Sequence, residues 1–430
     1  MNELIHREQL RGHCVAVVGA GSSGLAAASL ASALGARVLV ADRKDSFSPE
    51  VKDRAKSSGW TLVSGEHRPE HFREAQMIVL SPGVPRKKLK HCLPSQAQVF
   101  SELEFASWFV STPILAVTGT NGKTSTTLLL SHVLTECGKT VFTGGNIGTP
   151  LSEFVLEGRK ADILLLEVSS FQLQNCSGFR PAVGVLLNFS ANHLDYHADE
   201  QEYLEAKLKL FARQQEKDLA VVPFALRERL ARLDFTAAKT VYFMPRGVFV
   251  CSALPGEHNQ ANMEAAYHAC RYFGVSEESF QKALNGFRPP EHRQEIFLVH
   301  NGIRYVNDSK ATSVDALRAA LASFPAPVRL LAGGVFKGGD LSQVNGLLQA
   351  KAAKVYLFGD SREIFESAWK EAVGMEWFSS LEAAARRAVE ESSPGDNVIL
   401  SPATASFDLF PDYKARGDTF KETVKRAVHI

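Results

Sequence analysis

The sequence predicts an α/β protein made of three domains. Short apolar runs alternate with helix-like stretches along the chain, which is typical of parallel α/β architecture. At 430 residues the chain is too long for one ordinary domain, because about 150 residues per domain are usual. Three series of strands each begin with their own glycine-rich or polar loop, so we expect three α/β domains.

The domain boundaries are expected near residues 102 and 290, which gives domains at 1–101, 102–290 and 291–430. A new strand–loop–helix unit follows the first boundary, and the second lies at Pro289 and Pro290, which would interrupt regular structure. The expected strands are, in order, 15–18, 38–41 and 77–80; 114–117, 141–143, 163–168 and 183–187; and 304–307, 328–331, 354–358 and 397–400.

Composition argues against several classes of protein. Lys+Arg 48 against Asp+Glu 47 gives a net charge of +1, so no global basic field favours nucleic acid or an anionic membrane, and we expect neither partner. The basic run at 86–90 is expected to be a solvated surface. Six widely spaced cysteines and a polar, charged N-terminus indicate reduced thiols and a cytoplasmic protein.

A glycine turn follows the first expected strand. VAVVGAGSSGLAAA places Gly19, Gly21 and Gly24 in the spacing GxGxxG, and Asp42 ends the next strand. In Rossmann-like domains such glycines let a diphosphate approach a helix N-terminus, and the later acid binds a ribose. A nicotinamide or flavin enzyme, a nucleotide-sugar site and a structural turn all remain open here. Residues 81–83 form another polar loop at a strand end.

The second domain opens with the most specific segment of the chain. In ILAVTGTNGKTSTTLLL an apolar strand enters the loop 119–124, and a helix pattern follows. Backbone N–H groups would hold phosphate oxygens, while Lys123 adds a charge and Thr124 a hydroxyl for Mg²⁺. The first glycine of the common P-loop pattern would fall at Val117, which argues against a typical kinase or GTPase. We therefore expect a P-loop-type ATPase domain with a shorter loop.

Two further strand ends supply an acid and an imidazole. Glu167 ends the apolar run DILLLE, and VLLNFSANHLDYH turns polar at Asn188 before His193 and Asp195. Each is compatible with an ordinary polar strand terminus. Because the carboxyl ends of parallel strands converge, we expect Glu167 and His193 near the phosphate loop, where a carboxylate can bind Mg²⁺.

Lys207 interrupts the apolar face of an expected helix at 203–211, between Tyr203 and Phe211. One interpretation is that its ammonium group extends to water. The other is a partly buried amine with a lowered pKa, nucleophilic enough to capture CO₂ as a carbamate near Mg²⁺. The sequence leaves both open.

Together these segments resemble the Mur ligases of peptidoglycan synthesis, and the resemblance spans nearly the whole chain. Its marks are VVGAGSSG, SPGV, TGTNGKT, GGNIG, LEVSSFQL, the N…HLD block, EAKLKLF, GEHNQAN, EHRQE, NDSKATS and LSPATASFDLF. TGTNGKT and NDSKAT are shared widely in the family and, in related form, by folylpolyglutamate synthases. The GxGxxG turn with SPG and the closing SPATASFDLF resemble the members that add D-glutamate.

The resemblance implies an ATP-dependent amide ligase with a Rossmann-like first domain, a P-loop-type central domain and a Rossmann-like C-terminal domain. The first would bind a UDP-sugar, the second ATP, and the third ATP and D-glutamate. The implied substrates are UDP-N-acetylmuramoyl-L-alanine and D-glutamate, and the implied cofactors are ATP and Mg²⁺ at two sites. A monomer is implied as well.

Individual positions match functional residues of the family. The positions matching UDP-sugar contacts are Gly21, Ser22, Ser23, Gly24, Asp42, Lys44, Ser81, Gly83, Asn146 and Gln172. Those matching ATP contacts are Gly119, Thr120, Asn121, Gly122, Lys123, Thr124, Ser125, Asn259, Asn262, Arg293 and Asp308. Those matching D-glutamate contacts are Lys310, Thr312, Lys337, Ser406, Phe407 and Tyr413. The implied catalytic set is Lys123, Glu167, His193 and Lys207, and the implied metal set is Thr124, Glu167, His193 and Lys207, the last as a carbamylated lysine.

Three departures from the family pattern stand out. Asn192 replaces the usual acid before the metal-site histidine, and an aromatic pair of the D-glutamate set reads Phe407 and Tyr413. Before Lys337, the run GGVF with Val335 and Phe336 lacks the acid usual after the glycines. We therefore expect altered packing around the amino acid and weaker local support for Lys337.

The implied chemistry is transfer of the γ-phosphoryl group of ATP to the alanyl carboxylate, followed by attack of the D-glutamate amine on the acyl phosphate. Lys123 and Mg²⁺ would reduce the repulsion between the two anions. His193 would orient or deprotonate the amine, although metal binding competes with that role. The third domain would have to close over ATP.

Three other hypotheses compete with this ligase. A folylpolyglutamate-type ligase would share the chemistry but would not be expected to carry the GxGxxG-bearing first domain. A nicotinamide oxidoreductase would leave the GKT loop unexplained, and a non-catalytic nucleotide-sugar sensor would have no need of Lys123, Glu167, His193 and Lys310.

Overall fold

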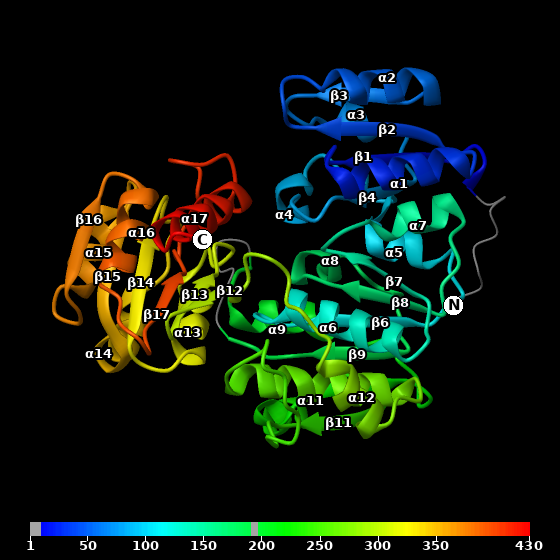
Figure 1. Cartoon of the computed structure of the whole chain (residues 1–430). Helices are drawn as coiled ribbons and strands as arrows, with labels where there is room; N and C mark the ends of the chain where they lie inside the picture. Colours follow the sequence, from blue (N-terminus) through cyan, green and yellow to red (C-terminus); the bar gives the residue numbers. More distant parts are fainter. Residues whose placement is uncertain (1–9, 191–196) are drawn as a thin grey trace. The chain divides into compact units, whose positions relative to one another are not determined.

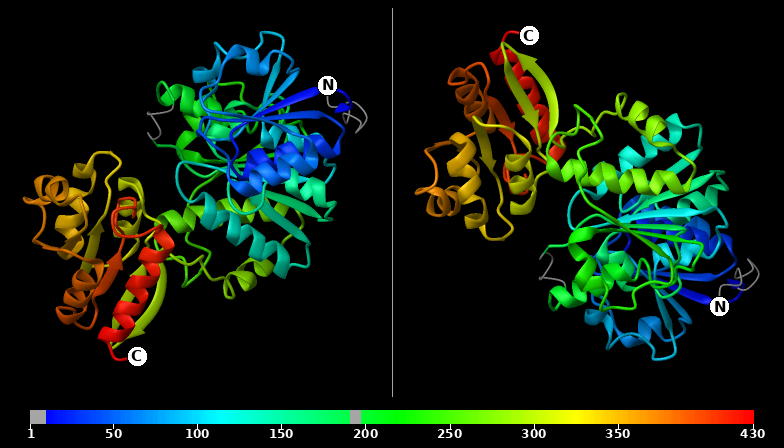
Figure 2. Two further views of the ribbon diagram at one scale, coloured as in Figure 1. Left: turned by 90° about the horizontal axis from the view of Figure 1, so that it is seen from above. Right: turned by 90° about the horizontal axis from the view of Figure 1, so that it is seen from below.

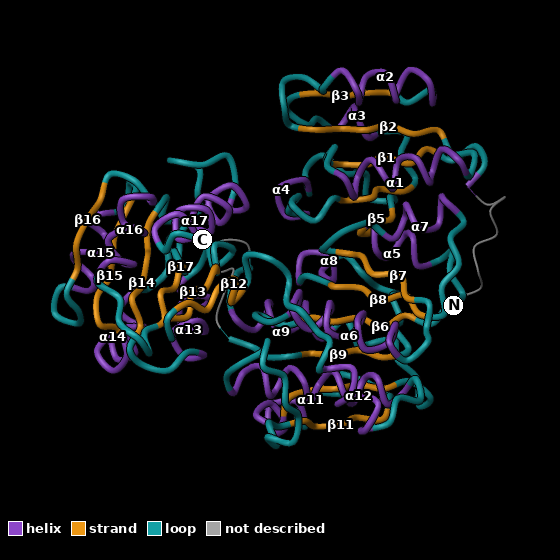
Figure 3. Tube along the Cα trace, viewed as in Figure 1, coloured by secondary structure: helices purple, strands orange, loops and turns teal. Residues whose placement is uncertain are grey.

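The computed structural model describes residues 10–190 and 197–430 and contains three sheets covered by helices (Figure 1). Strands and helices alternate along the described chain, as Figure 3 shows. The predicted α/β class with three sheet-containing parts is therefore confirmed. No helix in the described chain has the length and apolarity needed to cross a bilayer.

The chain divides into two compact units. The first runs to Met244 and includes Glu264–Ala283, and the second comprises Pro245–Met263 and Leu284–Ile430. The first two sheets belong to the first unit and the third sheet to the second. The boundary expected near 102 lies inside the first unit, so the division into three domains stays a prediction.

The first sheet is five-stranded and parallel throughout, in the order β3-β2-β1-β4-β5. Its central strand is buried along its whole length, which explains the uninterrupted apolar sequence CVAVV. The strands are β1 (Cys14–Val18), β2 (Arg37–Asp42), β3 (Thr61–Ser64), β4 (Met77–Leu80) and β5 (Gln98–Ser101). The helices are α1 (Ser22–Ala33), α2 (Pro49–Ser58), α3 (Pro69–Phe72), α4 (Arg86–Leu89) and α5 (Glu102–Ser107).

The middle sheet has six parallel strands in the order β11-β10-β9-β6-β8-β7. The strands are β6 (Ile114–Thr118), β7 (Val141–Gly145), β8 (Ile163–Glu167), β9 (Val183–Leu186), β10 (Leu219–Pro223) and β11 (Lys239–Phe243). The helices of this stretch are α6 (Lys123–Glu136), α7 (Leu151–Glu157), α8 (Ser170–Gln174), α9 (Glu200–Leu208), η2 (Phe224–Leu226), α10 (Arg227–Leu230), α11 (Glu257–Tyr272) and α12 (Glu277–Leu284).

Helix α5 joins the first and middle sheets within the first unit. A carboxylate oxygen of Glu102 accepts a hydrogen bond from the backbone N–H of Ser152 at 2.7 Å. The carboxylate of Glu104 accepts from the N–H groups of Ser177 at 3.2 Å and of Gly178 and Phe179 at 2.8 Å. Both glutamates are buried, so these bonds fasten the start of α7 and the loop at 177–179 to α5.

The third sheet has six strands in the order β12-β13-β17-β14-β15-β16, of which only the β12–β13 pair is antiparallel. The strands are β12 (Glu295–His300), β13 (Ile303–Asn307), β14 (Val328–Gly333), β15 (Ala352–Phe358), β16 (Met375–Phe378) and β17 (Asn397–Leu400). The helices are α13 (Val314–Ser323), η3 (Leu341–Val344), α14 (Asn345–Lys351), α15 (Arg362–Trp369), α16 (Leu381–Glu390) and α17 (Tyr413–Ala427).

Helices cover both faces of the third sheet. Leu317, Phe365 and Trp369 pack one face from α13 and α15, whereas Ala385 and Phe420 pack the other from α16 and α17. The two views of Figure 2 show α17, in red, alongside β12 and β13. The chain therefore has a buried core on each side of this sheet.

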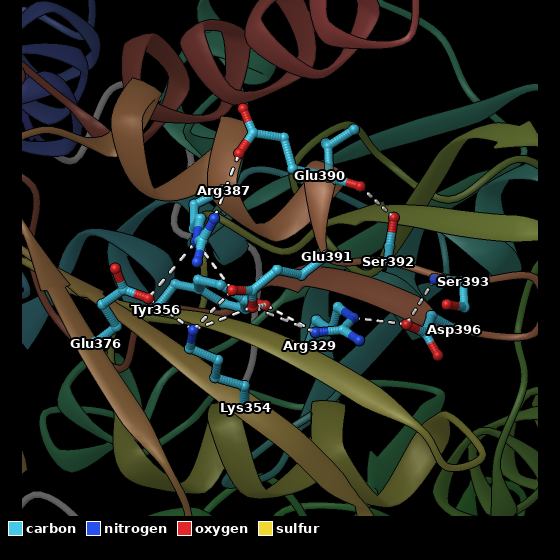
Figure 4. Close-up of polar contacts among 11 residues, drawn as sticks. Arg329, Lys354, Tyr356, Glu376, Arg387, Glu390, Glu391, Ser392, Ser393 and Asp396 are labelled. Carbon is cyan, nitrogen blue, oxygen red and sulfur yellow. Dashed lines mark hydrogen bonds and ion pairs between the residues drawn. The ribbon is translucent and has the colours of Figure 1, made fainter.

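A polar network fastens α16 to the third sheet (Figure 4). Glu391, directly after α16, accepts hydrogen bonds from the Tyr356 hydroxyl at 2.6 Å and from Lys354 at 3.0 Å. Arg329 pairs with Asp396 at 2.6 Å and donates to the Tyr356 hydroxyl at 2.9 Å. Every cation of the network has an acid within reach, so we interpret it as structural.

Candidate active site

Polar groups from four neighbouring strands of the middle sheet meet at its carboxyl edge. The loop 119–122 follows β6, Asn146 follows β7, Glu167 ends β8 and Asn188 follows β9. Asn188 and Asn121 bond twice, the Asn121 N–H to the Asn188 Oδ1 at 2.8 Å and the Asn188 Nδ2 to the Asn121 carbonyl at 3.0 Å. This pairing fixes the phosphate loop against the end of β9.

Lys123 begins helix α6 and folds back on its own loop. Its Nζ donates to the carbonyl oxygens of Gly119 at 2.7 Å and Thr120 at 2.8 Å. Gly122 has φ +80°, a left-handed conformation that favours glycine, and it caps the helix. The ammonium group is thus held at the helix N-terminus, where an anion is also favoured.

Glu167 is the centre of a small oxygen-rich cluster. It is 2% exposed, and its two carboxylate oxygens accept from the Thr124 hydroxyl at 2.7 Å and from the Asn146 Nδ2 at 2.8 Å. A carboxylate beside a hydroxyl is the kind of donor set that Mg²⁺ prefers, so Thr124 and Glu167 fit the predicted metal site. Asn146, which the resemblance assigns to the UDP-sugar, lies in this cluster.

The predicted metal ligand His193 lies outside the described residues, as do Asn192 and Asp195. Among the residues that the structure describes, no three His, Cys, Asp or Glu side chains gather as a metal site.

Lys207 is buried, not extended to water. Its side chain lies on α9, which Asp199 caps, and the residue is 1% exposed. Its Nζ donates to the Gly119 carbonyl at 2.9 Å and lies 4.4 Å from the centre of the Tyr203 ring. Burial, and then the charge of Lys123, hold the pKa of Lys207 well below its usual value. The structure therefore contradicts an ammonium group that extends to water and agrees with a buried amine of lowered pKa, while capture of CO₂ stays a prediction.

The glycine turn of the first sheet has the predicted tight packing. A Cβ on Gly24 would meet the Gly19 carbonyl oxygen at 1.9 Å, whereas a Cβ on Gly21 would meet nothing within 4 Å. Asp42 accepts from the backbone N–H groups of Ala20 at 2.7 Å and Lys44 at 3.0 Å. Its carboxylate therefore shapes the turn while the turn itself stays open at Gly21.

The remaining positions of the first unit that match UDP-sugar contacts differ in exposure and in hydrogen bonding. The Ser81 hydroxyl donates to the Gly19 carbonyl at 2.8 Å, and Ser22 and Gly83 are exposed. Gln172 is buried, and its Oε1 accepts from the Ser169 N–H at 3.0 Å in the cap of α8. Gln172 thus closes the capping box of α8 with Ser169, a partner that the Ser-x-x-Gln spacing could have indicated and that the sequence analysis missed.

The second unit carries the other part of the predicted ATP set. Asn259 and Asn262 lie on α11, and the Asn262 Nδ2 donates to the Asn259 Oδ1 at 3.4 Å. Asp308 follows β13 and accepts from the Ser401 hydroxyl at 2.9 Å. Burial raises the pKa of Asp308 to about 7, against the opposing effect of that bond and of Arg293 nearby.

Two lysines of the predicted D-glutamate set rest on aromatic rings. The Lys310 Nζ lies 3.9 Å from the centre of the Tyr413 ring, and the Lys337 Nζ lies 5.2 Å from that of Phe407. Thr312 is exposed and Ser406 is buried. Within the second unit, the structure therefore places both ammonium groups next to the segment 406–413.

Arg416 is a residue that the sequence analysis missed. It is completely buried on α17, and its guanidinium donates to the Ser309 Oγ at 3.0 Å, the Ser309 carbonyl at 2.8 Å and the Thr404 carbonyl at 3.0 Å. These bonds hold the segments that precede Lys310 and Ser406. Other basic residues of the helix, such as Lys414 and Arg426, make it look like a solvated basic surface, so no signal in the sequence distinguished Arg416.

Comparison with known proteins gives matches along most of the chain. Residues 13–98 match the Mur ligase MurD-like N-terminal domain, 117–243 the Mur ligase middle domain and 292–404 the Mur ligase glutamate ligase domain. A relative from Nitratidesulfovibrio vulgaris (strain DP4) named UDP-N-acetylmuramoylalanine–D-glutamate ligase is 49% identical over 418 residues, which cover 96% of each chain. The chain belongs to the Mur ligase family.

Other Mur ligases extend the likeness. A relative of the same name from Desulfovibrio desulfuricans is 47% identical, again over 96% of each chain. The crystal structure of a MurF ligase from Thermotoga maritima in complex with ADP has a TM-score of 0.61 at 18% identity, covering 100% of this chain and 99% of that one. At 18% identity the similarity to the MurF structure concerns the fold alone. That fold agrees with the three-sheet α/β architecture of this chain.

Proposed function

We propose that this Mur ligase joins D-glutamate to UDP-N-acetylmuramoyl-L-alanine, with ATP converted to ADP and phosphate through an acyl phosphate. The observation that carries the proposal is the near full-length similarity to ligases named for this reaction. The meeting of Lys123, Thr124, Glu167 and Lys207 around one phosphate loop supports it, because these groups suit phosphoryl transfer between two anions.

In the proposed reaction Lys123 exchanges the carbonyls of Gly119 and Thr120 for phosphate oxygens of ATP. Thr124 and Glu167 would hold Mg²⁺, which supplies positive charge against the anionic oxygens when bound. Outside the described residues, His193 would orient the amine of D-glutamate or accept its proton. The alanyl carboxylate takes up the γ-phosphoryl group, and the neutral amine then displaces phosphate.

Lys207 is proposed to react with CO₂ before turnover. Its neutral amine forms an N–C bond to CO₂ and loses one proton to solvent, so a neutral group at the site becomes an anion. The burial of the lysine and its lowered pKa support this step, and the anion would help to hold a second Mg²⁺.

The second unit is proposed to supply the amino-acid site and part of the ATP site. Lys310 and Lys337 would bind the two carboxylates of D-glutamate, with Thr312, Ser406, Phe407 and Tyr413 around them. Asn259, Asn262, Arg293 and Asp308 would contact ATP, which implies closure during turnover. We further propose a monomer in the cytoplasm, as the family resemblance and the six free thiols suggest.

The test is release of inorganic phosphate from ATP. We expect release only when both UDP-N-acetylmuramoyl-L-alanine and D-glutamate are present, and loss of turnover in Lys123→Met. Lys160→Met is the control, since Lys160 is exposed and remote in sequence from the loop. Phosphate release without D-glutamate, or an absorbance change with NADH instead, would contradict the proposal.

A further inference from the structure

The loop that carries Lys337 is anchored through the two residues before it. Val335 and Ala405 exchange backbone hydrogen bonds at 2.9 and 3.0 Å, and the Phe336 N–H donates to the Ser361 hydroxyl at 2.9 Å. The Phe336 ring also packs against the core of the third sheet. The run that lacks the acid usual in the family therefore fixes the backbone, and Lys337 begins the exposed part of the loop.

Phe407 is the group that the Lys337 ammonium approaches. The distance from Nζ to the ring centre is 5.2 Å, and Phe407 remains 67% exposed. In the described chain, Lys337 forms no ion pair with an acid. A phenyl ring this exposed gains little from burial, so its place beside a lysine calls for another reason.

We infer that Phe407 is a positioning residue that orients Lys337 toward a carboxylate of the incoming amino acid. The inference rests on the proposed function. An acidic partner would neutralise the lysine and compete with the carboxylate of the substrate, whereas an aromatic face restrains an ammonium group by a weak cation–π attraction and leaves its charge available. Lys310, 3.9 Å from the Tyr413 ring centre, has the same kind of support.

Two such lysines suit an amino acid with two carboxylates. A monocarboxylic D-amino acid would need only one of them. The pairing of Lys337 with Phe407 therefore bears on the choice of a dicarboxylic substrate, and its loss is expected to affect the amino acid and not the nucleotides.

The experiment compares Phe407→Leu, Phe407→Trp and the control Leu409→Ala, a nearby exposed side chain. Phosphate release gives kcat and separate KM values for D-glutamate, ATP and the UDP-sugar. Phe407→Leu should raise KM for D-glutamate about two- to fivefold, the equivalent of about 0.5–1 kcal/mol, with the other two KM values unchanged. Phe407→Trp, which keeps an aromatic face, should restore the wild-type value.

A Lys337→Met background separates positioning from direct contact. There Phe407→Leu should have no further effect on KM for D-glutamate, because the inference assigns the ring an action through the lysine and not, as its place in the D-glutamate set alone would imply, a direct contact with the amino acid. A further rise would overturn the inference, as would an unchanged KM in the single variant. If the unmodified enzyme releases no D-glutamate-dependent phosphate, the proposed function fails instead, so the two failures are distinguishable.

Discussion

Asp308 is expected to contact ATP, and its carboxyl group has a raised pKa. Its carboxyl group is buried after β13, and its pKa is raised to about 7, whereas in an unfolded chain it would be about 4. Between these values the folded state binds more protons than the unfolded state, so stability falls as pH rises, by at most about 1.4 kcal/mol per pH unit. This contribution is complete below about pH 4 and is lost as pH rises through about 7.

We therefore predict that Asp308→Asn flattens the pH dependence of unfolding. The unfolding temperature of the variant minus that of the wild type should increase from pH 5 to pH 8. The variant should also lose activity if Asp308 contacts ATP. Scanning calorimetry at stepped pH measures the difference. The exposed Asp45→Asn should leave the pH profile unchanged, and a parallel profile for Asp308→Asn would refute the prediction.

Substitution of Lys207 is expected to affect turnover without lowering the stability of the fold. Its amine is buried with a lowered pKa and bonds to the Gly119 carbonyl, so replacing it by an apolar side chain of similar length removes little stabilisation. We predict that Lys207→Met unfolds at the wild-type temperature or above but loses turnover by about 100-fold or more. Circular dichroism melting and phosphate release check this. Full activity in a stable Lys207→Met would show that the lysine only packs.

At the scale of elements, the interior strands were predictable because they are apolar along their whole length. The expected strand at 114–117 corresponds to β6 and that at 328–331 to β14, both buried throughout or nearly so. The edge strands β3 and β16 were not predicted, since their residues are half-exposed and form no apolar run. Strand β10 was simply missed, although LAVVP is apolar and mostly buried.

The candidate site, too, was predictable only where the sequence pattern determines the structure. Convergence of the ends of β6 and β8 could be inferred from parallel topology, and the bond from Thr124 to Glu167 bears this out. Gln172 bonds to Ser169 only three residues before it, and that Ser-x-x-Gln spacing is a helix-cap pattern that could have been recognised. Arg416, in contrast, bonds to the backbone of Ser309 and Thr404, and Ser309 lies far away in sequence. Pattern and spacing carry no information about such contacts, so sequence reasoning could not find them.

Helix α5 should stabilise the first unit by holding the loop 177–179 of the middle sheet. Glu104 accepts three backbone hydrogen bonds from residues 177–179, and an amide oxygen cannot reproduce all of them. We predict that Glu104→Gln lowers the stability of the first unit by about 1–3 kcal/mol, because at least one buried N–H loses its acceptor. Urea unfolding followed by tryptophan fluorescence, to which Trp60 and Trp108 contribute from the first unit, measures it. Glu136→Gln, at an exposed glutamate, is the control. Equal stability of the two variants would contradict a stabilising role of Glu104.

For the whole molecule, the decisive feature is that the predicted ATP contacts are divided between two compact units. The loop 119–124 belongs to the first, whereas Asn259, Asn262 and Asp308 belong to the second. A ligand stabilises the segments that it contacts in the folded state. If one nucleotide contacts both groups, its binding must slow amide hydrogen exchange in two segments far apart in sequence.

We predict that ADP with Mg²⁺ and the UDP-sugar protects residues 119–126 and also residues 257–263 and 305–310 from hydrogen exchange. D-glutamate alone should protect neither 119–126 nor 257–263, because in the proposed reaction only the nucleotide would contact both groups; the segment 305–310 ends at Lys310, where D-glutamate itself is proposed to bind. Lys123→Met should weaken protection in all three together, since its own loop and the distant segments would respond to the same bound molecule. Protection confined to 119–126 would mean that the second unit does not contact the nucleotide, and that Asn259, Asn262 and Asp308 have another role.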